Sequence, residues 1–188
     1  MPNWVFNGLA VTGDNDKLEE FKNVIGKPLK LPDGSTVQKP IFSFLNIFYP
    51  DSSIDYNKEA WSSWNISYWG CKWDVRASDE GFQSTELQQE DELLLYRFQS
   101  PWSPPIIGIQ RLAQIYPHLE FNLEYEEENG WGGEVTYRDG IEAYSRQWDE
   151  PASHADFAAH PYRECYCLNH PYDEEFRFED CPKVEVGV

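Results

Sequence analysis

The sequence predicts an α+β domain of the ferredoxin-like, split βαβ type, followed by an irregular acidic extension. Segments with alternating apolar residues and segments with helical spacing follow the order strand–helix–strand–strand–helix–strand, which is the order of that fold. A hairpin signal comes next, and from residue 150 the chain is polar, acidic and interrupted by prolines. We therefore expect a domain over residues 1–149, with an insertion at 27–60, and an extension over 150–188.

The first half of the domain contains one clear strand and one clear helix. Residues 3–12 alternate apolar and polar side chains and stop at Gly13, which predicts a strand. Residues 16–25 carry apolar side chains at helical spacing and end at Gly26, which predicts a helix. Within the proline-rich insertion, the apolar residues 41–49 are expected to lie over the domain as a short strand or helix.

The second half supplies the remaining elements. Strands are expected at 73–78, 92–99 and 119–126, and a helix at 106–115. The almost continuous apolar run at 92–99 favours a central position in the sheet. The dipeptide Asp139-Gly140 predicts a tight hairpin turn between strands at 132–138 and 141–148.

Six of the eight tryptophans lie beside glycines and prolines, outside regular apolar repeats. An indole ring in such a place caps a sheet or lines a groove, because it offers a large apolar face and one N–H donor. We expect Trp69, Trp73 and Trp102 to bury most of their rings against the sheet. The alternative is an aromatic groove for a ligand, formed by Trp69, Trp73, Trp102 and Trp131.

The composition is that of a folded protein without membrane or secretion signals. Aromatic residues make up 16% of the chain, and no run of about 18 apolar residues is present. The first residues have no basic region followed by an apolar stretch, so we expect a soluble cytoplasmic protein whose four cysteines are reduced.

Negative charge is concentrated in the second part of the chain. Of the net charge of −18, residues 1–119 carry −5 and residues 120–188 carry −13. Such a field repels nucleic acid and speeds association with a basic protein, although an acidic surface also serves solubility alone. Alternation places Glu124 and Glu126 on one face of their strand. The candidate partner-binding carboxylates are Glu124, Glu126, Glu127, Glu128, Asp139, Glu142, Asp173, Glu174 and Glu175.

The extension holds cysteines and histidines that could bind a metal. Four of them, Cys165, Cys167, His170 and Cys181, could supply tetrahedral zinc ligands. Paired zinc ligands usually have two or more residues between them, whereas one residue separates Cys165 from Cys167. We therefore expect ordinary thiols, with no metal and no other cofactor.

Several separated motifs are similar to those of a known family. They are Pro2-Asn3-Trp4-Val5-Phe6-Asn7 with Val11-Thr12-Gly13, Trp69-Gly70-Cys71-Lys72-Trp73-Asp74, Ser100-Pro101-Trp102-Ser103-Pro104-Pro105, and Gly130-Trp131-Gly132-Gly133-Glu134. Together they resemble the YubB-type family of phage- and plasmid-encoded proteins, over residues 1–148. The resemblance implies a ferredoxin-like fold and a mobile-element origin, and it brings no catalytic residues. Cys71 departs from the pattern, which usually has a small hydroxyl residue there.

These observations favour a binding protein over an enzyme. We expect a phage or mobile-element protein that blocks a basic host protein, such as a CRISPR or restriction nuclease complex, through an acidic surface that mimics phosphate. One alternative is a small hydrolase or metal-dependent enzyme that uses the Cys/His set or the tryptophan groove. Another is a module that binds a nucleotide between indole rings. Direct binding of nucleic acid or membrane is not expected, and the sequence leaves the oligomeric state open.

Overall fold

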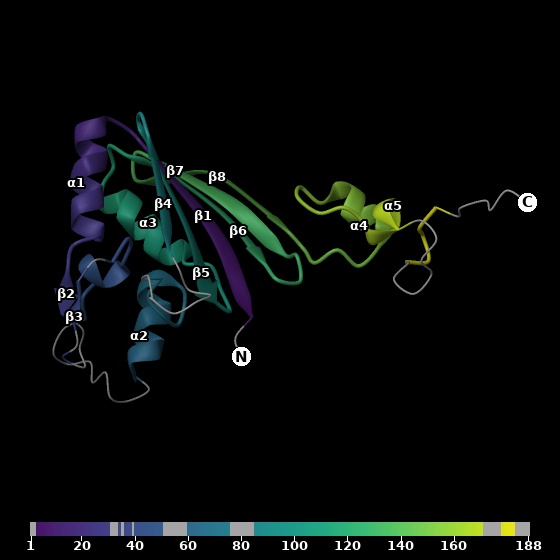
Figure 1. The fold of residues 1–188 in the computed structure, drawn as a ribbon, viewed down its shortest axis with the longest axis horizontal. Helices are drawn as coiled ribbons and strands as arrows, with labels where there is room; N and C mark the ends of the chain where they lie inside the picture. Colours follow the sequence, from purple (N-terminus) through teal and green to yellow (C-terminus); the bar gives the residue numbers. More distant parts are fainter. Residues whose placement is uncertain are drawn as a thin grey trace, which may run out of the picture.

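A six-stranded antiparallel sheet organises the protein, in the strand order β4-β5-β1-β6-β7-β8 (Figure 1). The computed structural model describes residues 3–30, 34, 36–38, 40–50, 60–75, 85–170 and 178–182. The strands are β1 (Trp4–Thr12), β4 (Glu86–Glu90), β5 (Leu93–Pro101), β6 (Glu120–Glu127), β7 (Gly132–Arg138) and β8 (Ile141–Trp148). The strands β4, β5, β1 and β6 have the order and antiparallel pairing of the ferredoxin-like fold, which confirms the predicted fold class. The hairpin β7–β8 extends the sheet beyond β6.

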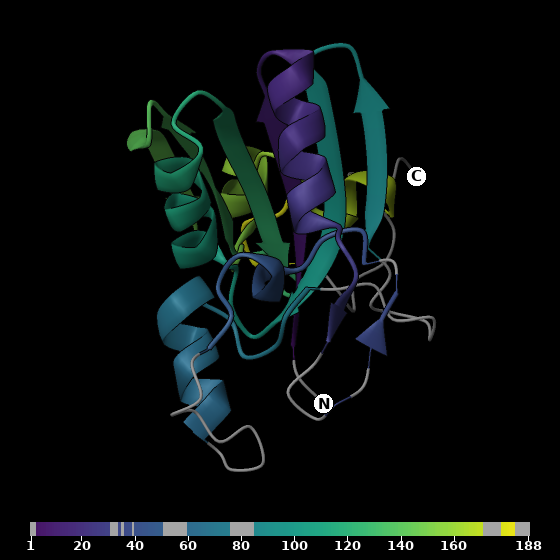
Figure 2. The ribbon, with the colours of Figure 1, turned by 90° about the vertical axis from the view of Figure 1, so that its left-hand side faces the viewer.

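Two helices cover one face of this sheet. The helices α1 (Asn15–Ile25) and α3 (Ile106–Ile115) lie on the same side of the strands in both views (Figures 1 and 2). Their apolar side chains pack on alternate residues of the strands and form the main core, in which each fully buried aliphatic or aromatic side chain contributes about 1.5–3 kcal/mol. The other residues of each strand lie on the opposite side, which we call the open face.

The remaining elements lie on both sides of the sheet. The short strands β2 (Leu29–Lys30) and β3 (Thr36–Val37), the 3-10 helix η1 (Phe44–Asn46) and the helix α2 (Ala60–Trp69) precede β4. The helices of the extension, α4 (His154–Ala159) and α5 (Tyr166–Asn169), lie on the opposite side of the sheet from α1 and α3 (Figures 1 and 2). No helix among the described residues combines the length and apolar character needed to cross a membrane.

Two elements differ from the sequence-based expectation. Most of the tryptophan-rich stretch 61–74 forms the helix α2. A strand was expected at 73–78, but Trp73–Val75 lie outside any strand, and residues 76–78 are not among those described. The strand that follows the insertion is instead β4, at the edge of the sheet. Its sequence, ELQQE, contains one apolar residue, because an edge strand exposed on both sides needs no apolar alternation.

Gly108 brings α3 close to α2 and η1. A Cβ atom added to Gly108 would lie 2.7 Å from Trp69 Cβ and 2.7 Å from Phe44 Cε1. Trp69 is fully buried at this contact and stacks on Phe44, with 5.7 Å between the ring centroids. The glycine therefore lets the tryptophan-rich helix and the insertion join the domain core.

Candidate functional site

The open face of the sheet carries a groove of about 580 Å³. Its lining residues come from β1, β4, β5 and β6, and from Tyr162 of the extension. Phe6 and Gly8 reach this face because the alternating residues Val5 and Leu9 are fully buried on the helix side. The groove therefore follows from strand alternation in a sheet whose helices cover one face.

Hydrogen-bond acceptors dominate the polar lining of the groove. Glu86, Glu124 and Glu126 supply carboxylates, and Gln99 Oε1 is a buried acceptor without a hydrogen-bond partner among the described residues. Arg97 is the cation in the described lining, and it is the cross-strand neighbour of Glu86 in the β4–β5 pair. Such a set of acceptors suits a ligand that brings hydrogen-bond donors and positive charge.

Two aromatic rings and a glycine give the groove its shape. Phe6 is 48% exposed and Tyr162 is 54% exposed, so both rings offer apolar surface to a ligand. A Cβ atom added to Gly8 would meet no atom within 4 Å, and the groove is therefore open above this position. Partial burial and the nearby charge of Glu124 raise the pKa of the Tyr162 phenol, which stays neutral at physiological pH.

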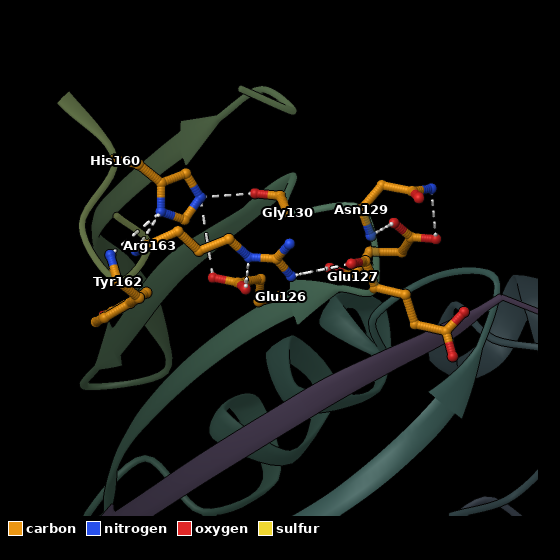
Figure 3. Close-up of polar contacts among 8 residues, drawn as sticks. Glu126, Glu127, Asn129, Gly130, His160, Tyr162 and Arg163 are labelled. Carbon is orange, nitrogen blue, oxygen red and sulfur yellow. Dashed lines mark hydrogen bonds and ion pairs between the residues drawn. The ribbon is translucent and has the colours of Figure 1, made fainter. Parts of the chain in front are cut away.

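Polar contacts hold the extension against the edge of the groove (Figure 3). Arg163 Nε donates to Glu126 Oε1 at 2.6 Å, and Arg163 Nη2 donates to the carbonyl oxygens of Glu127 at 3.2 Å and Glu128 at 3.0 Å. An ion pair of this kind, with one guanidinium bound to several oxygens, fixes orientation as well as position.

His160 completes this attachment through both of its ring nitrogens. His160 Nδ1 accepts hydrogen bonds from the backbone N–H groups of Tyr162 at 3.2 Å and Arg163 at 3.0 Å. Its Nε2–H donates to the carbonyl oxygen of Gly130 at 2.8 Å. Trp148 packs edge-on against the rings of both His160 and Tyr162. Tyr162 is therefore held firmly at the groove.

The candidate partner-binding carboxylates do not form one solvated surface. Glu124 is exposed on the open face, as alternation predicts, whereas Glu126 on the same face is paired with Arg163. The side chain of Glu127 is buried, and its carboxylate accepts the backbone N–H of Asn129 at 2.7 Å. This capping role was not predicted, because alternation alone does not identify a carboxylate that turns inward at the end of a strand.

The other candidate carboxylates lie in separate places. Glu128 is exposed beside the β6–β7 turn, and Asp139 occupies the β7–β8 turn with a φ of 52°. Glu142 is the cross-strand neighbour of the buried Tyr137 and therefore belongs to the helix side of the sheet. The carboxylates Asp173, Glu174 and Glu175 lie outside the described residues.

The four tryptophans of the predicted aromatic groove do not come together. Trp69 is fully buried, Trp73 is partly buried and Trp102 is 46% exposed, so the expected burial of all three is wrong for Trp102. The rings of Trp73 and Trp102 lie 5.2 Å apart, and Lys72 Nζ lies 4.9 Å from the centroid of the Trp102 ring. Trp131 packs separately against the core, and a groove containing the buried Trp69 is excluded.

The extension brings four potential metal ligands together. The ligand atoms of His154, Cys165, Cys167 and Cys181 all lie within 4.8 Å of one another. His170, the sequence-based candidate, instead stacks on Tyr166 with 4.0 Å between ring centroids. Sequence spacing missed His154, because it lies in a different helix from Cys167. Burial and hydrogen bonds from Cys165 and Cys181 raise the pKa of Cys167 to about 12 when no metal is bound.

The remaining cysteine is unsuited to nucleophilic catalysis. Cys71 is fully buried, and its sulfur donates to the carbonyl oxygen of Trp73 at 3.2 Å. Burial and the charge of Asp74 raise the pKa of the Cys71 thiol well above its usual value. A buried, protonated thiol is a poor nucleophile, so Cys71 packs as an apolar side chain.

Comparisons with known proteins agree with this architecture. Residues 72–163 match the family model described as a ferredoxin-like domain in Api92-like protein. Among solved structures, the chain is similar to the crystal structure of protein api92 from Yersinia pseudotuberculosis, with a TM-score of 0.58 and 12% identity. That match covers 80% of this chain and 99% of the Yersinia chain, and at this identity it shows the fold alone. No curated protein matches the sequence. Residues 72–163 are thus similar to the ferredoxin-like domain of Api92-like proteins, and the sheet with its two covering helices has the ferredoxin-like fold.

Proposed function

We propose that the protein binds a basic segment of a partner protein in the open-face groove. The observation that carries this proposal is the lining itself, which combines the exposed rings of Phe6 and Tyr162 with the carboxylates of Glu86, Glu124 and Glu126. A guanidinium or ammonium group gains cation–π energy over an aromatic face and charge-assisted hydrogen bonds from carboxylates. An arginine or lysine side chain of the partner therefore fits the groove better than an anion does.

The charge of the whole chain supports this choice of partner. A net charge of −18 repels nucleic acid and attracts a basic protein over the Debye length of about 8–10 Å. Arg97 in the lining supplies a donor for a carbonyl oxygen of the same partner segment. A peptide that carries both a basic side chain and backbone carbonyls matches both kinds of group.

The biological setting of this activity is part of the proposal. The resemblance to mobile-element proteins supports a phage or plasmid protein that acts in the cytoplasm of its host. Host proteins that handle nucleic acid, including CRISPR and restriction nucleases, carry basic surfaces that contact phosphate. In this role the groove carboxylates replace phosphate groups, and the bound protein inhibits the host defence complex.

Capture of host proteins on the immobilised full chain tests the proposal. Wild type is compared with Glu124→Lys, which reverses the exposed charge at the groove, and with Asp16→Lys, which makes the same change on α1 on the other side of the sheet. We expect a basic protein that is retained at low salt, released at high salt, lost with Glu124→Lys and kept with Asp16→Lys.

Direct binding to DNA and RNA is measured in parallel by gel shift. We expect no shift at physiological salt, because the net charge opposes phosphate. Equal loss of partner with both charge reversals would contradict a groove-specific site. Tight binding of nucleic acid by the wild type would contradict the mimicry of phosphate.

A further inference from the structure

The cysteine and histidine side chains of the extension converge from three separate chain segments. We propose that His154, Cys165, Cys167 and Cys181 bind one zinc ion that holds the extension in its fold. The four ligand atoms lie within 4.8 Å of one another, and the three cysteines are buried. This site is independent of the groove and of any partner.

Two of the distances among the ligand atoms are close to those of a tetrahedral metal centre. With Zn–S bonds of about 2.3 Å and Zn–N bonds of about 2.0–2.1 Å, tetrahedral angles separate two sulfurs by roughly 3.8 Å and a sulfur from a nitrogen by roughly 3.6 Å. Cys165 Sγ lies 3.7 Å from Cys181 Sγ, and Cys167 Sγ lies 3.2 Å from His154 Nδ1. A disulfide would need sulfurs about 2.05 Å apart, and all four cysteines are free thiols.

Local hydrogen bonds explain how distant residues reach the same place. The carboxylate of Asp180 accepts the backbone N–H groups of His154 at 2.9 Å and Ala155 at 3.0 Å. This cap on the first turn of α4 brings Cys181, the next residue in the chain, beside His154. The cap therefore places the ligands His154 and Cys181 side by side, although they lack the short sequence spacing that is typical of a zinc site.

The other two ligands come from the start of α5. Cys165 is the N-cap residue of α5, and Cys167 lies in its first turn, so the short helix presents both sulfurs at one end. A single intervening residue is therefore compatible with joint ligation, since the two cysteines belong to a helix start and not to an extended hairpin.

Within the described part of the extension, the apolar cluster is small. The three cysteines are the buried residues of its apolar cluster, with Phe157 and Phe178 packed against them in the described part. Segments below about 40 residues usually need disulfides or metals to fold. A purely apolar role would account for buried thiols, but not for an imidazole nitrogen directed at a sulfur. Three thiolates and one imidazole are ligands that favour zinc.

Metal analysis of the purified full chain tests this assignment. We expect about one zinc per chain after dialysis, and tetrahedral thiolate absorption bands when Co²⁺ replaces zinc. Cys167→Ser should lower zinc affinity by about tenfold or more, because it removes one thiolate ligand. His170→Ala is the matched control, since His170 lies in the same segment outside the cluster, and its zinc content should equal that of the wild type.

A second measurement covers the outcome in which Cys167→Ser fails to fold. Chelation of zinc from the wild type should speed amide hydrogen exchange in residues 154–169 and leave the exchange of β1 and β6 unchanged. Zinc content below a tenth of an equivalent, or a Cys165–Cys181 disulfide by mass spectrometry of freshly purified protein, would overturn the assignment. Unchanged exchange after chelation would also overturn it.

Discussion

Glu124 and Glu134 are directly opposed on neighbouring strands of the open face, and of the two only Glu134 forms an ion pair among the described residues. The carboxylate of Glu134 forms an ion pair with Arg146 at 3.2 Å and accepts a hydrogen bond from Asn122 at 3.1 Å. Among the described residues, Glu124 has no ion-pair partner. Like charges directly opposite on paired strands are destabilising. Glu124 therefore lacks the ion pair that offsets the charge of Glu134.

Neutralising Glu124 should weaken partner binding without lowering the free energy of unfolding. Glu124→Gln removes the repulsion from Glu134, so the free energy of unfolding should be unchanged or rise by up to about 1 kcal/mol. The same variant should bind the basic partner more weakly, because it lacks the groove charge. Chemical denaturation and partner affinity measured on the same preparation check both parts. A clear loss of stability would mean that Glu124 serves the fold.

The two tryptophans Trp69 and Trp102 should respond very differently to truncation. Trp69 is fully buried against Phe44 and Gly108, so Trp69→Ala should cost about 3–5 kcal/mol of unfolding free energy. Trp102 is 46% exposed, and Trp102→Ala should cost about 1 kcal/mol or less beyond its contact with Lys72. Thermal or urea unfolding of the pair measures the difference. Equal costs would contradict the assigned packing of the tryptophan-rich helix.

Arg163 should control the attachment of the extension. Arg163→Met keeps much of the side-chain length but loses the bonds to Glu126 and to the carbonyls of Glu127 and Glu128. Since hydrogen bonds to charged groups contribute about 1.5–3 kcal/mol, the extension should open more readily, with faster proteolysis near residues 149–153. Arg138→Met is the control, because its pair with Glu120 is exposed and exposed ion pairs contribute little to stability. Equal proteolysis of both variants and the wild type would refute the docking role.

Tyr137 should make the fold sensitive to alkaline pH. Burial, followed by the charge of Glu142, raises the pKa of the Tyr137 phenol to about 12. The folded state therefore favours the protonated phenol, so this contribution to stability is complete below the usual tyrosine pKa near 10 and is lost as the pH rises through about 12. The fall in unfolding free energy between pH 10 and 12 should be shallower in Tyr137→Phe than in the wild type. Parallel curves would show that Tyr137 ionises normally.

Most of the fold could be predicted from the sequence, because its main helices and strands have clear hydrophobic periodicity. Period-two alternation identified β1 and β6, helical spacing identified α1 and α3, and Asp139-Gly140 identified the hairpin. The edge strand β4 was missed because it is exposed and lacks apolar alternation. The helix α2 was missed because its apolar residues surround the helix and give no single face.

Less of the candidate sites could be predicted from the sequence, because they depend on contacts between segments that are distant in the chain. Alternation did identify Glu124 as exposed, and the same rule applied to β1 and β5 would have placed Phe6, Gly8, Arg97 and Gln99 on that face. Nothing local predicts that Arg163 pairs with Glu126, thirty-seven positions away. The contribution of His154 to the cysteine cluster depends in the same way on the Asp180 cap, which only the folded extension contains.

The most direct test of the binding proposal fills the groove without changing its charge. Gly8→Val adds a side chain where a Cβ atom meets nothing within 4 Å, at a strand position that favours valine. The measurement is the dissociation constant of the captured basic partner for wild type and Gly8→Val, by calorimetry at one salt concentration. We predict an affinity at least about tenfold weaker, or about 1.4 kcal/mol, with an unfolding free energy that is unchanged or higher. An unchanged dissociation constant for the folded Gly8→Val protein would contradict the assignment of the open-face groove as the binding site.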